Sequence, residues 1–359
     1  MLFAKKRKLC DKMEIFKEKM GHIGEEVVYA LTLKNSQGIT VTCINYGCRI
    51  TSIKTPDKKG HIADIVLGYD HLADYITDQA YLGAICGRVA GRIKRGHFYL
   101  DEGEIQLSQN DGRHHIHGGI SNFSHALWSF ETEKSKETAA IKFFYTSKHL
   151  EEGYPGEVDV TVTYMLNEKN QFVITYHGQA KEKTVINLTN HTYFNLNQNS
   201  PNILNHDLQI RSEKFLELDE EALPTGRLLS TEKTPFDLTC KKRLKKQLIE
   251  KHPQLEMAKN GYNHPFILTN HFEEEIILSE EISGRKLTVE TDCPSVVVYT
   301  ASYFNEDFLI KGKKAAKYMG ICLETQGFPD AVNHGHFPSI VLEEGEAYES
   351  TTRYTFGVL

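Results

Sequence analysis

The chain has 359 residues, 40% of them hydrophobic, and 42 basic residues nearly balance 48 acidic ones to give a net charge of −6. This length and apolar fraction are enough to bury a large core. The mild negative charge argues against a broad nucleic-acid-binding surface.

Cysteine usage and hydropathy indicate the compartment. The seven cysteines include no C-x-x-C pair, which predicts free thiols in a reducing environment rather than disulfides or a structural zinc site. No apolar run reaches the roughly 18 residues of a membrane span. No apolar segment follows the basic N-terminus, so no secretory signal is predicted. We therefore expect a soluble, cytoplasmic protein that binds neither nucleic acid nor membrane.

The first residues differ in character from the rest. "KKRK" at Lys5 to Lys8 is the one basic cluster, and it lies in a polar stretch that is typical of a frayed, solvated end. Residues 1–12 are therefore predicted to be a flexible N-terminal leader. No Pro/Ser-rich linker and no repeat of 20 to 50 residues divides the remainder, so we expect residues 13–359 to form a single domain.

Most of the remaining chain predicts strands. Short runs rich in Val, Ile, Thr, Tyr and Phe alternate apolar and polar residues, and turns rich in Gly, Asn and Asp separate them. The predicted strands cover 38–47, 63–69, 139–147, 157–166, 171–180, 286–292 and 295–304. One amphipathic helix is predicted near 238–251. This density of strands predicts an all-β fold, a mostly antiparallel sandwich or barrel with few helices.

Familiar cofactor motifs are missing from the sequence. "GRVAGR" at 87–92 is not a dinucleotide-binding G-x-G-x-x-G, and no Walker loop, H-E-x-x-H or G-x-S-x-G occurs. An enzyme of this sequence would therefore rely on side-chain acid–base chemistry.

Two glycine-rich segments carry candidate ligand-binding side chains. In "CGRVAGRIKRG", Arg88 and Arg92 could hold hydroxyls or a carboxylate, although two surface arginines in a loop are the commoner outcome. In "DGRHHIHGG", an extended backbone would place His115 and His117 on one face and His114 on the other. His117 could equally face a ligand or serve as a hydrogen-bonding loop histidine.

Two further segments carry candidate acid–base groups. In "NLTNHTYFNL" (187–196), a strand would place Asn187, Thr189 and His191 on one face. Such a histidine suits acid–base work, although a structural histidine is more common. In "GICLETQGFPDAVNH" (320–334), Glu324 ends an apolar strand, where a carboxylate is costly unless it is paired or functional. Gln326 adds a polar group at the same turn, which favours a functional role.

Together these segments resemble the aldose 1-epimerase family, the galactose mutarotases. The resemblance runs from about Gly38 to Leu359, with the motifs in the family's order. "NLTNHTYFNL" and "CLETQGFPDA" are the specific ones, and "GRVAGRI", "HGG", "EEGYPGEV", "GYNHPF" and "VYTASYF" accompany them. The resemblance implies a large antiparallel β-sandwich, a small-molecule sugar substrate, and neither cofactor nor metal.

Matching positions carry over the family's site roles. The resemblance implies that Glu324 is the catalytic base and His191 the acid. It further implies that His117 holds the sugar near its ring oxygen and that Arg92 contacts sugar hydroxyls. Asn263 occupies another substrate-binding position of the family. Tyr193 and Phe304 are candidates to stack on the sugar, with ordinary core packing as the equal alternative.

Three positions depart from the galactose-active pattern of the family. Gly91 stands where many members have Asn, Asn263 where many have Asp, and Val297 where many have Gln. Asn263 can still bond a hydroxyl, but Val297 cannot. The acid and base are retained, so these changes bear on which sugar is preferred.

The resemblance therefore predicts an isomerase that interconverts the α and β anomers of free aldoses such as galactose and glucose, acting as a monomer or homodimer. A hexose-phosphate mutarotase is the first alternative, but it should gather several Lys or Arg. A non-catalytic sugar-binding sandwich would need no acid–base pair. A glycosidase would need two carboxylates, where the sequence shows one.

Overall fold

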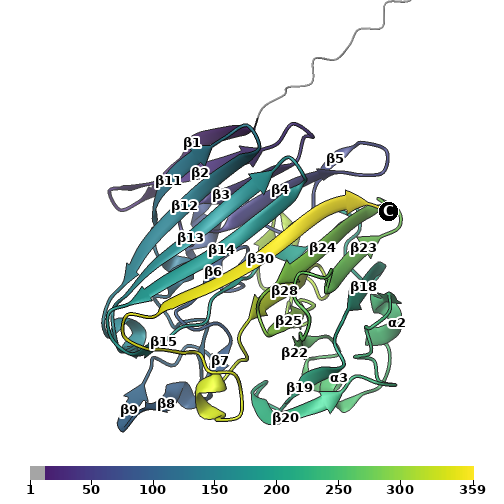
Figure 1. Ribbon diagram of the computed structural model, residues 1–359. Coiled ribbons are helices and arrows are strands. Elements are labelled where there is room, and N and C mark those ends of the chain that lie inside the picture. Colours follow the sequence, from purple (N-terminus) through teal and green to yellow (C-terminus); the bar gives the residue numbers. More distant parts are fainter. Residues whose placement is uncertain (1–12) are drawn as a thin grey trace, which may run out of the picture.

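The structure, a computed structural model, describes residues 13–359 of the chain, so the predicted leader at 1–12 lies outside the described residues. Strands dominate it (Figure 1). The α-helices within the described part are short, namely α1 (Leu72–Ile76), α2 (Leu244–Leu248) and α3 (Pro253–Met257). None of them is long and apolar enough to cross a membrane. The predicted all-β class is confirmed.

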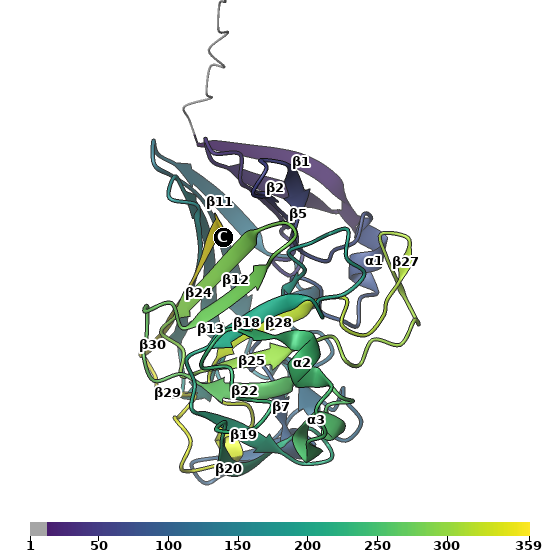
Figure 2. The same cartoon turned by 90° about the vertical axis from the view of Figure 1, so that its right-hand side faces the viewer.

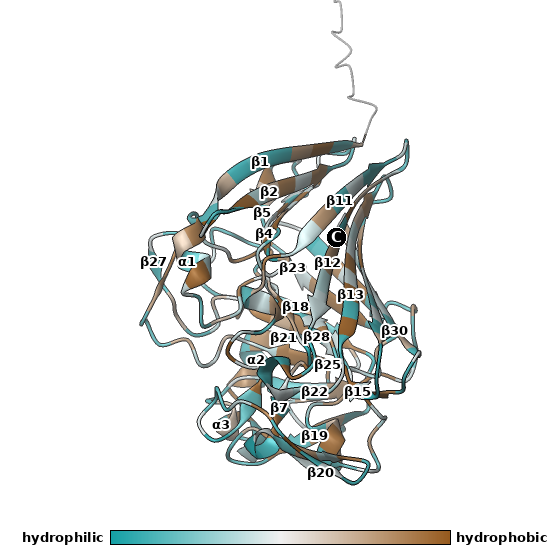
Figure 3. Ribbon diagram, turned by 90° about the vertical axis from the view of Figure 1, so that its left-hand side faces the viewer, coloured by the Kyte–Doolittle hydropathy of each residue, from teal (hydrophilic) through white to brown (hydrophobic). Residues whose placement is uncertain are grey.

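Two antiparallel sheets face each other across the main core. The first is five-stranded, in the order β1 (Glu14–Ile23), β2 (Glu26–Lys34), β3 (Thr40–Ile44), β4 (Ile50–Pro56) and β5 (Ile62–Asp64). The second is nine-stranded, in the order β11 (Ser129–Lys134), β12 (Thr138–Ser147), β13 (Val158–Asn167), β14 (Gln171–Ala180), β30 (Ala347–Val358), β24 (Arg285–Thr291), β23 (Ile276–Glu280), β18 (His206–Ile210) and β21 (Lys242–Arg243). Figure 3 shows the two sheets as separate layers.

The alternating sequence explains why these sheets form a sandwich. Along β13 and β14 every second residue is buried, because successive side chains on a strand point to opposite faces. The inward residues of both sheets join one apolar cluster, which includes Leu31 and Val41 from the smaller sheet and Ile141, Val160 and Ile174 from the larger. Burial of these faces drives the packing of one sheet on the other.

A third, six-stranded sheet positions the site (Figure 2). Its order is β17 (Tyr193–Phe194), β28 (Ile321–Gln326), β25 (Ser295–Tyr299), β22 (Asn263–Ile267), β19 (Lys214–Leu218) and β20 (Pro224–Ser230). Short two-stranded ladders complete the described strands. They are β6 (Ile85–Cys86) with β16 (Thr189–Asn190), β7 (Arg92–Ile93) with β10 (His115–Ile116), β8 (His97–Leu100) with β9 (Gly103–Gln106), β15 (Thr184–Val185) with β29 (Val341–Leu342), and β26 (Leu309–Ile310) with β27 (Lys313–Lys314).

The predicted helix over 238–251 is wrong in extent. Only Leu244–Leu248 is helical, and Lys242–Arg243 pairs with β18 as a strand. The Leu238 carbonyl accepts a hydrogen bond from the Ile210 amide at 2.7 Å, which ties this segment to the edge of the large sheet. Tertiary hydrogen bonding thus overrides the helical spacing of the leucines. The predicted free thiols are confirmed for the six cysteines in the described residues.

Candidate active site

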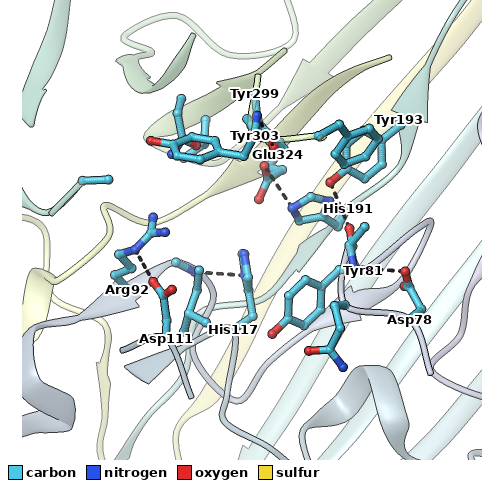
Figure 4. A pocket seen from close by; sticks show the side chains of 18 of the residues that line it. Asp78, Tyr81, Arg92, Asp111, His117, His191, Tyr193, Tyr299, Tyr303 and Glu324 are labelled. Carbon is cyan, nitrogen blue, oxygen red and sulfur yellow. Dashed lines mark hydrogen bonds and ion pairs between the residues drawn. The ribbon is translucent and has the colours of Figure 1, made fainter. Parts of the chain in front are cut away.

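A cavity of about 910 Å³ lies on one face of the six-stranded sheet. Side chains from all six strands line it, and within a strand they are alternate residues, which share a face. We call this set the floor: Tyr193, Leu218, Pro224, Asn263, Pro265, Val297, Tyr299, Glu324 and Gln326. Arg92 of β7 and loop residues complete the walls, among them Tyr81, Asp111, His117 and Tyr303 (Figure 4).

Glu324 and His191 meet at this floor. Glu324 is 3% exposed and His191 4% exposed, and His191 Nε2 lies 3.6 Å from Glu324 Oε1. Asn187 and Thr189 reach the same strand: Asn187 Oδ1 accepts from the Gly327 amide at 2.8 Å, and Thr189 Oγ1 donates to the Thr325 carbonyl at 3.0 Å. The three side chains thus contact the end of β28, although only Thr189 of them lies in a strand, β16 (Thr189–Asn190).

The surroundings of Glu324 and His191 determine which of the two is protonated. Burial raises the pKa of Glu324 to about 8, which the positive charge of Arg92 partly opposes. Burial also lowers the pKa of His191 to about 4. Between these values the pair holds one proton, which rests on the carboxyl while the imidazole is neutral. Two groups in contact that share one proton can pass it through a bound molecule.

His117 approaches the pair from the end of β10. Its backbone turns to a φ of 50° there, and its Nδ1 accepts from the Gly91 amide at 3.3 Å. The other ring nitrogen points toward His191 and Glu324 (Figure 4). Because Nδ1 is an acceptor, the proton of this neutral ring sits on Nε2, and burial holds the pKa of His117 well below its usual value. His117 therefore presents a donor to the cavity. His115 lies elsewhere, against Ser108 and Tyr154.

His117, His191 and Glu324 also lie close enough to ligate a metal ion, with ligand atoms within 4.8 Å of one another. The protonation of His117 does not suit that role, because a nitrogen that carries a proton has no lone pair for a metal. The three side chains fit a proton-transfer site better than a metal centre.

The two arginines of the glycine motif differ. Arg92 lines the cavity, and its Nε donates to Asp111 Oδ2 at 2.7 Å. Arg88 is 1% exposed and donates to the carbonyls of Pro155 and Gly156 at 2.8 and 2.7 Å. The alternative of two surface arginines is wrong for Arg88, which is buried and joins neighbouring segments through its hydrogen bonds. Arg92 lines the cavity and can contact a ligand.

The predicted aromatic residues also lie at the site. Tyr193 and Phe304 line the cavity with ring centroids 5.3 Å apart, and the Tyr193 hydroxyl donates to the Ala80 carbonyl at 2.9 Å. Asn263 and Val297 lie on the floor, and Gly91 lines the wall. The residues assigned to acid–base and substrate-binding roles thus line one cavity, whereas Arg88 and His115 lie outside it.

Sequence reasoning missed Tyr81. Its ring centroid lies 4.8 Å from that of His117 and 5.9 Å from that of His191, so it packs against both imidazoles. It adopts a φ of 55°, which is uncommon for a bulky residue. No motif marks this position, since the contact depends on the folded loop alone.

The loop that carries Tyr81 is held by a second buried carboxylate, also missed. Asp78 accepts from Arg49 Nη1 at 2.5 Å and from the Tyr69 hydroxyl at 2.9 Å. It also accepts from the amides of residues 80 and 82 at 3.0 and 2.8 Å. The same loop holds the backbone of His191, whose amide donates to the Ala84 carbonyl at 2.8 Å. Asp78 thereby fixes one edge of the site.

A β-sandwich with a cavity around a buried carboxyl–imidazole pair defines a class of enzymes that move protons on a small polar substrate. Comparison with known proteins identifies the family within it. The aldose 1-epimerase family model matches residues 29–355. Galactose mutarotase from Bos taurus is 40% identical over 342 residues, covering 94% of this chain and 96% of that protein. Aldose 1-epimerase from Escherichia coli (strain K12) is 29% identical, covering 91% and 94%.

Solved structures give the same result. A galactose 1-epimerase from Lactobacillus acidophilus superposes with a TM-score of 0.87 at 27% identity, covering 97% of this chain and 99% of that one. An aldose epimerase homologue from C. elegans gives 0.82 at 28% identity, covering 90% and 97%. The chain belongs to the aldose 1-epimerase family, and so to the isomerases that act on carbohydrates.

Proposed function

We propose that this chain is a mutarotase that interconverts the α and β anomers of free aldoses such as galactose and glucose. The observation that carries the proposal is the buried Glu324–His191 pair, 3.6 Å apart and open to a cavity lined with hydroxyl-binding side chains. A non-catalytic sugar-binding protein has no use for such a pair, because burial of a carboxyl and an imidazole is costly.

The reaction needs one proton removed and one delivered. During ring opening Glu324 takes the proton of the anomeric hydroxyl, and His191 delivers one to the ring oxygen. The aldehyde end then rotates by half a turn, and closure reverses both transfers. Opening therefore starts from the tautomer with Glu324 ionised and His191 protonated, which the pair reaches by moving its one proton from the carboxyl to the imidazole. It ends with the proton on Glu324 and the imidazole neutral, which is the state that burial favours in the free site. Each positioned group contributes on the order of 10²–10⁴-fold.

The remaining side chains orient the sugar. The Nε2–H of His117 faces the pair and can donate to the ring oxygen or a neighbouring hydroxyl. Arg92, fixed by Asp111, and Asn263 offer donors to other hydroxyls, while Tyr193 and Phe304 cover an apolar sugar face. We assign these residues to substrate binding.

The charge of the cavity favours free sugars over hexose phosphates. Among the described lining residues Arg92 is the one Lys or Arg, and Asp111 already pairs with it. Asp74 and Asp307 add negative charge to the lining. A phosphate group needs several cations, so glucose 6-phosphate should be converted much more slowly than glucose.

Polarimetry on freshly dissolved α-galactose and α-glucose tests the function. The wild type should speed the approach to anomeric equilibrium, and Glu324→Gln and His191→Ala should each lose about 10²–10⁴-fold. Glu290→Gln and His264→Asn are matched controls, since both alter buried groups outside the cavity. A wild type without effect on the optical rotation would refute the function. A variant at Glu324 or His191 with the wild-type rate would refute that residue's role.

We further propose that residues 13–359 work as one domain, as a monomer or homodimer in the cytoplasm. The six free thiols of the described residues agree with a reducing compartment. Sedimentation analysis would decide between the two oligomeric states.

A further inference from the structure

Gln326 lies beside the catalytic carboxyl without a role so far. It is two residues after Glu324 on β28, so both side chains point to the cavity side of the sheet. Across the ladder Ser295 pairs with Gln326 and Val297 pairs with Glu324. The Gln326 residue is 0% exposed, yet its side chain lines the cavity.

The amide of Gln326 has an unused acceptor. Its Nε2 donates to the Gly327 carbonyl at 3.3 Å, and Oε1 has no hydrogen-bond partner in the part of the chain that the structure describes. The carbonyl of Gly327 can only accept, so the amide nitrogen must stay on that side and the oxygen remains free. A buried acceptor without a donor is costly. A sugar hydroxyl entering the cavity is such a donor.

Gly91 allows this arrangement. Its φ is 77°, and a Cβ there would lie 2.9 Å from Pro329 Cβ and 3.3 Å from Gln326 Nε2. Any side chain at position 91 would therefore press on the Gln326 amide. Val297, the diagonal neighbour of Gln326 on the floor, offers no hydrogen bond. Gly91 and Val297 have no side-chain group that can bond a hydroxyl. Of these three neighbours, Gln326 alone has one.

We propose that Gln326 binds a sugar hydroxyl through Oε1 and thereby contributes to the aldose preference of this chain, at a corner of the cavity where the side chains of Gly91 and Val297 offer no hydrogen bond. The inference rests on the proposed function, and it names a specificity-determining residue for that reaction. Its role is in substrate binding, because proton transfer belongs to Glu324 and His191.

Binding without turnover gives the first test. 1,5-Anhydrogalactitol and 1,5-anhydroglucitol lack the anomeric hydroxyl and cannot open, so calorimetry reports affinity alone. Gln326→Met keeps nearly the same side-chain volume but removes the amide. It should raise the Kd for the better-bound analogue about tenfold, as expected for one lost hydrogen bond. Gln209→Leu, on β18 and outside the cavity, should leave it unchanged. Gln326→Leu replaces the Met variant if that protein does not fold.

A series of deoxygalactoses gives the second test. For the wild type, kcat/KM should fall about tenfold for the sugar that lacks the bonded hydroxyl. The Gln326→Met variant should lose nothing further on that sugar, because the hydroxyl has no partner left to lose. Unchanged analogue affinity in the variant, or equal losses in both proteins for every deoxy sugar, would overturn the inference. A wild type that binds the analogues through Gln326 but does not mutarotate sugars would instead refute the proposed function.

Discussion

Two buried carboxylates flank the cavity and differ in how they are satisfied. Asp78 accepts hydrogen bonds from Arg49, Tyr69 and two backbone amides. Glu324 has His191 as its contact at 3.6 Å, and its pKa is raised by burial. A carboxylate surrounded by donors is held in one position and stabilises the structure around it. One with few donors is free to exchange a proton. The environment of each carboxylate, rather than its residue type, therefore decides whether it stabilises the structure, as Asp78 does, or can exchange a proton, as Glu324 can.

Removal of the well-bonded carboxylate should have the largest effect on stability. Asp78→Ala leaves the fully buried Arg49 guanidinium without its partner, and breaking such a pair costs about 3–5 kcal/mol. Urea unfolding followed by circular dichroism would measure the loss. A variant as stable as the wild type would show that the loop over 78–84 does not depend on Asp78.

Replacement of Glu324, the carboxylate with few donors, should instead increase the free energy of unfolding at high pH. The pKa of Glu324 is raised in the folded state from 4.5 to about 8, so the folded protein binds a proton that the unfolded chain releases in this window. Stability therefore falls as the pH rises from about 4.5 to about 8. Glu324→Gln, which does not titrate, should be more stable than the wild type by on the order of 4 kcal/mol at pH 8.

The same comparison at pH 4 is the control, because the folded and unfolded glutamates are both largely protonated below about 4.5. There the two proteins should unfold at similar urea concentrations. An equal difference in stability at both pH values would mean that folding does not raise the pKa of Glu324.

The pH profile of activity should show the shared proton directly. Below about 4 both members of the pair are protonated and no base remains, and above about 8 both are deprotonated and no acid remains. kcat/KM for galactose should therefore be level between these values and fall about tenfold per pH unit outside them. These apparent pKa values belong to the pair. A level profile through pH 9 would contradict the assignment.

Local pattern predicted much of this molecule. The strand over 171–180 matches β14 (Gln171–Ala180), because strict alternation meets a sheet with one buried face. Alternation over 187–191 is less apt, because only Thr189–Asn190 forms a strand there, although all three side chains contact the end of β28. Glu324 stood out because an apolar strand rarely ends in a carboxylate without a reason.

What the pattern missed depends on contacts between distant segments. Asp78 and Tyr81 lie in a loop without a motif, and their importance comes from Arg49 and from two histidines far along the chain. The leucine spacing at 238–251 is helical, but hydrogen bonds to β18 limit the helix to Leu244–Leu248. The unpaired Gln326 oxygen appears only when all its neighbours are in place.

The floor of the cavity takes side chains from all six strands of its sheet, which span the chain from Tyr193 to Gln326. A sugar bound there bridges segments that separate when the protein unfolds. Its binding energy thus becomes part of the folding energy, by RT ln(1 + [L]/Kd). The stability of this fold in a cell therefore depends on the concentration of free sugar. A sugar concentration one hundred times Kd raises the free energy of unfolding by about 2.7 kcal/mol.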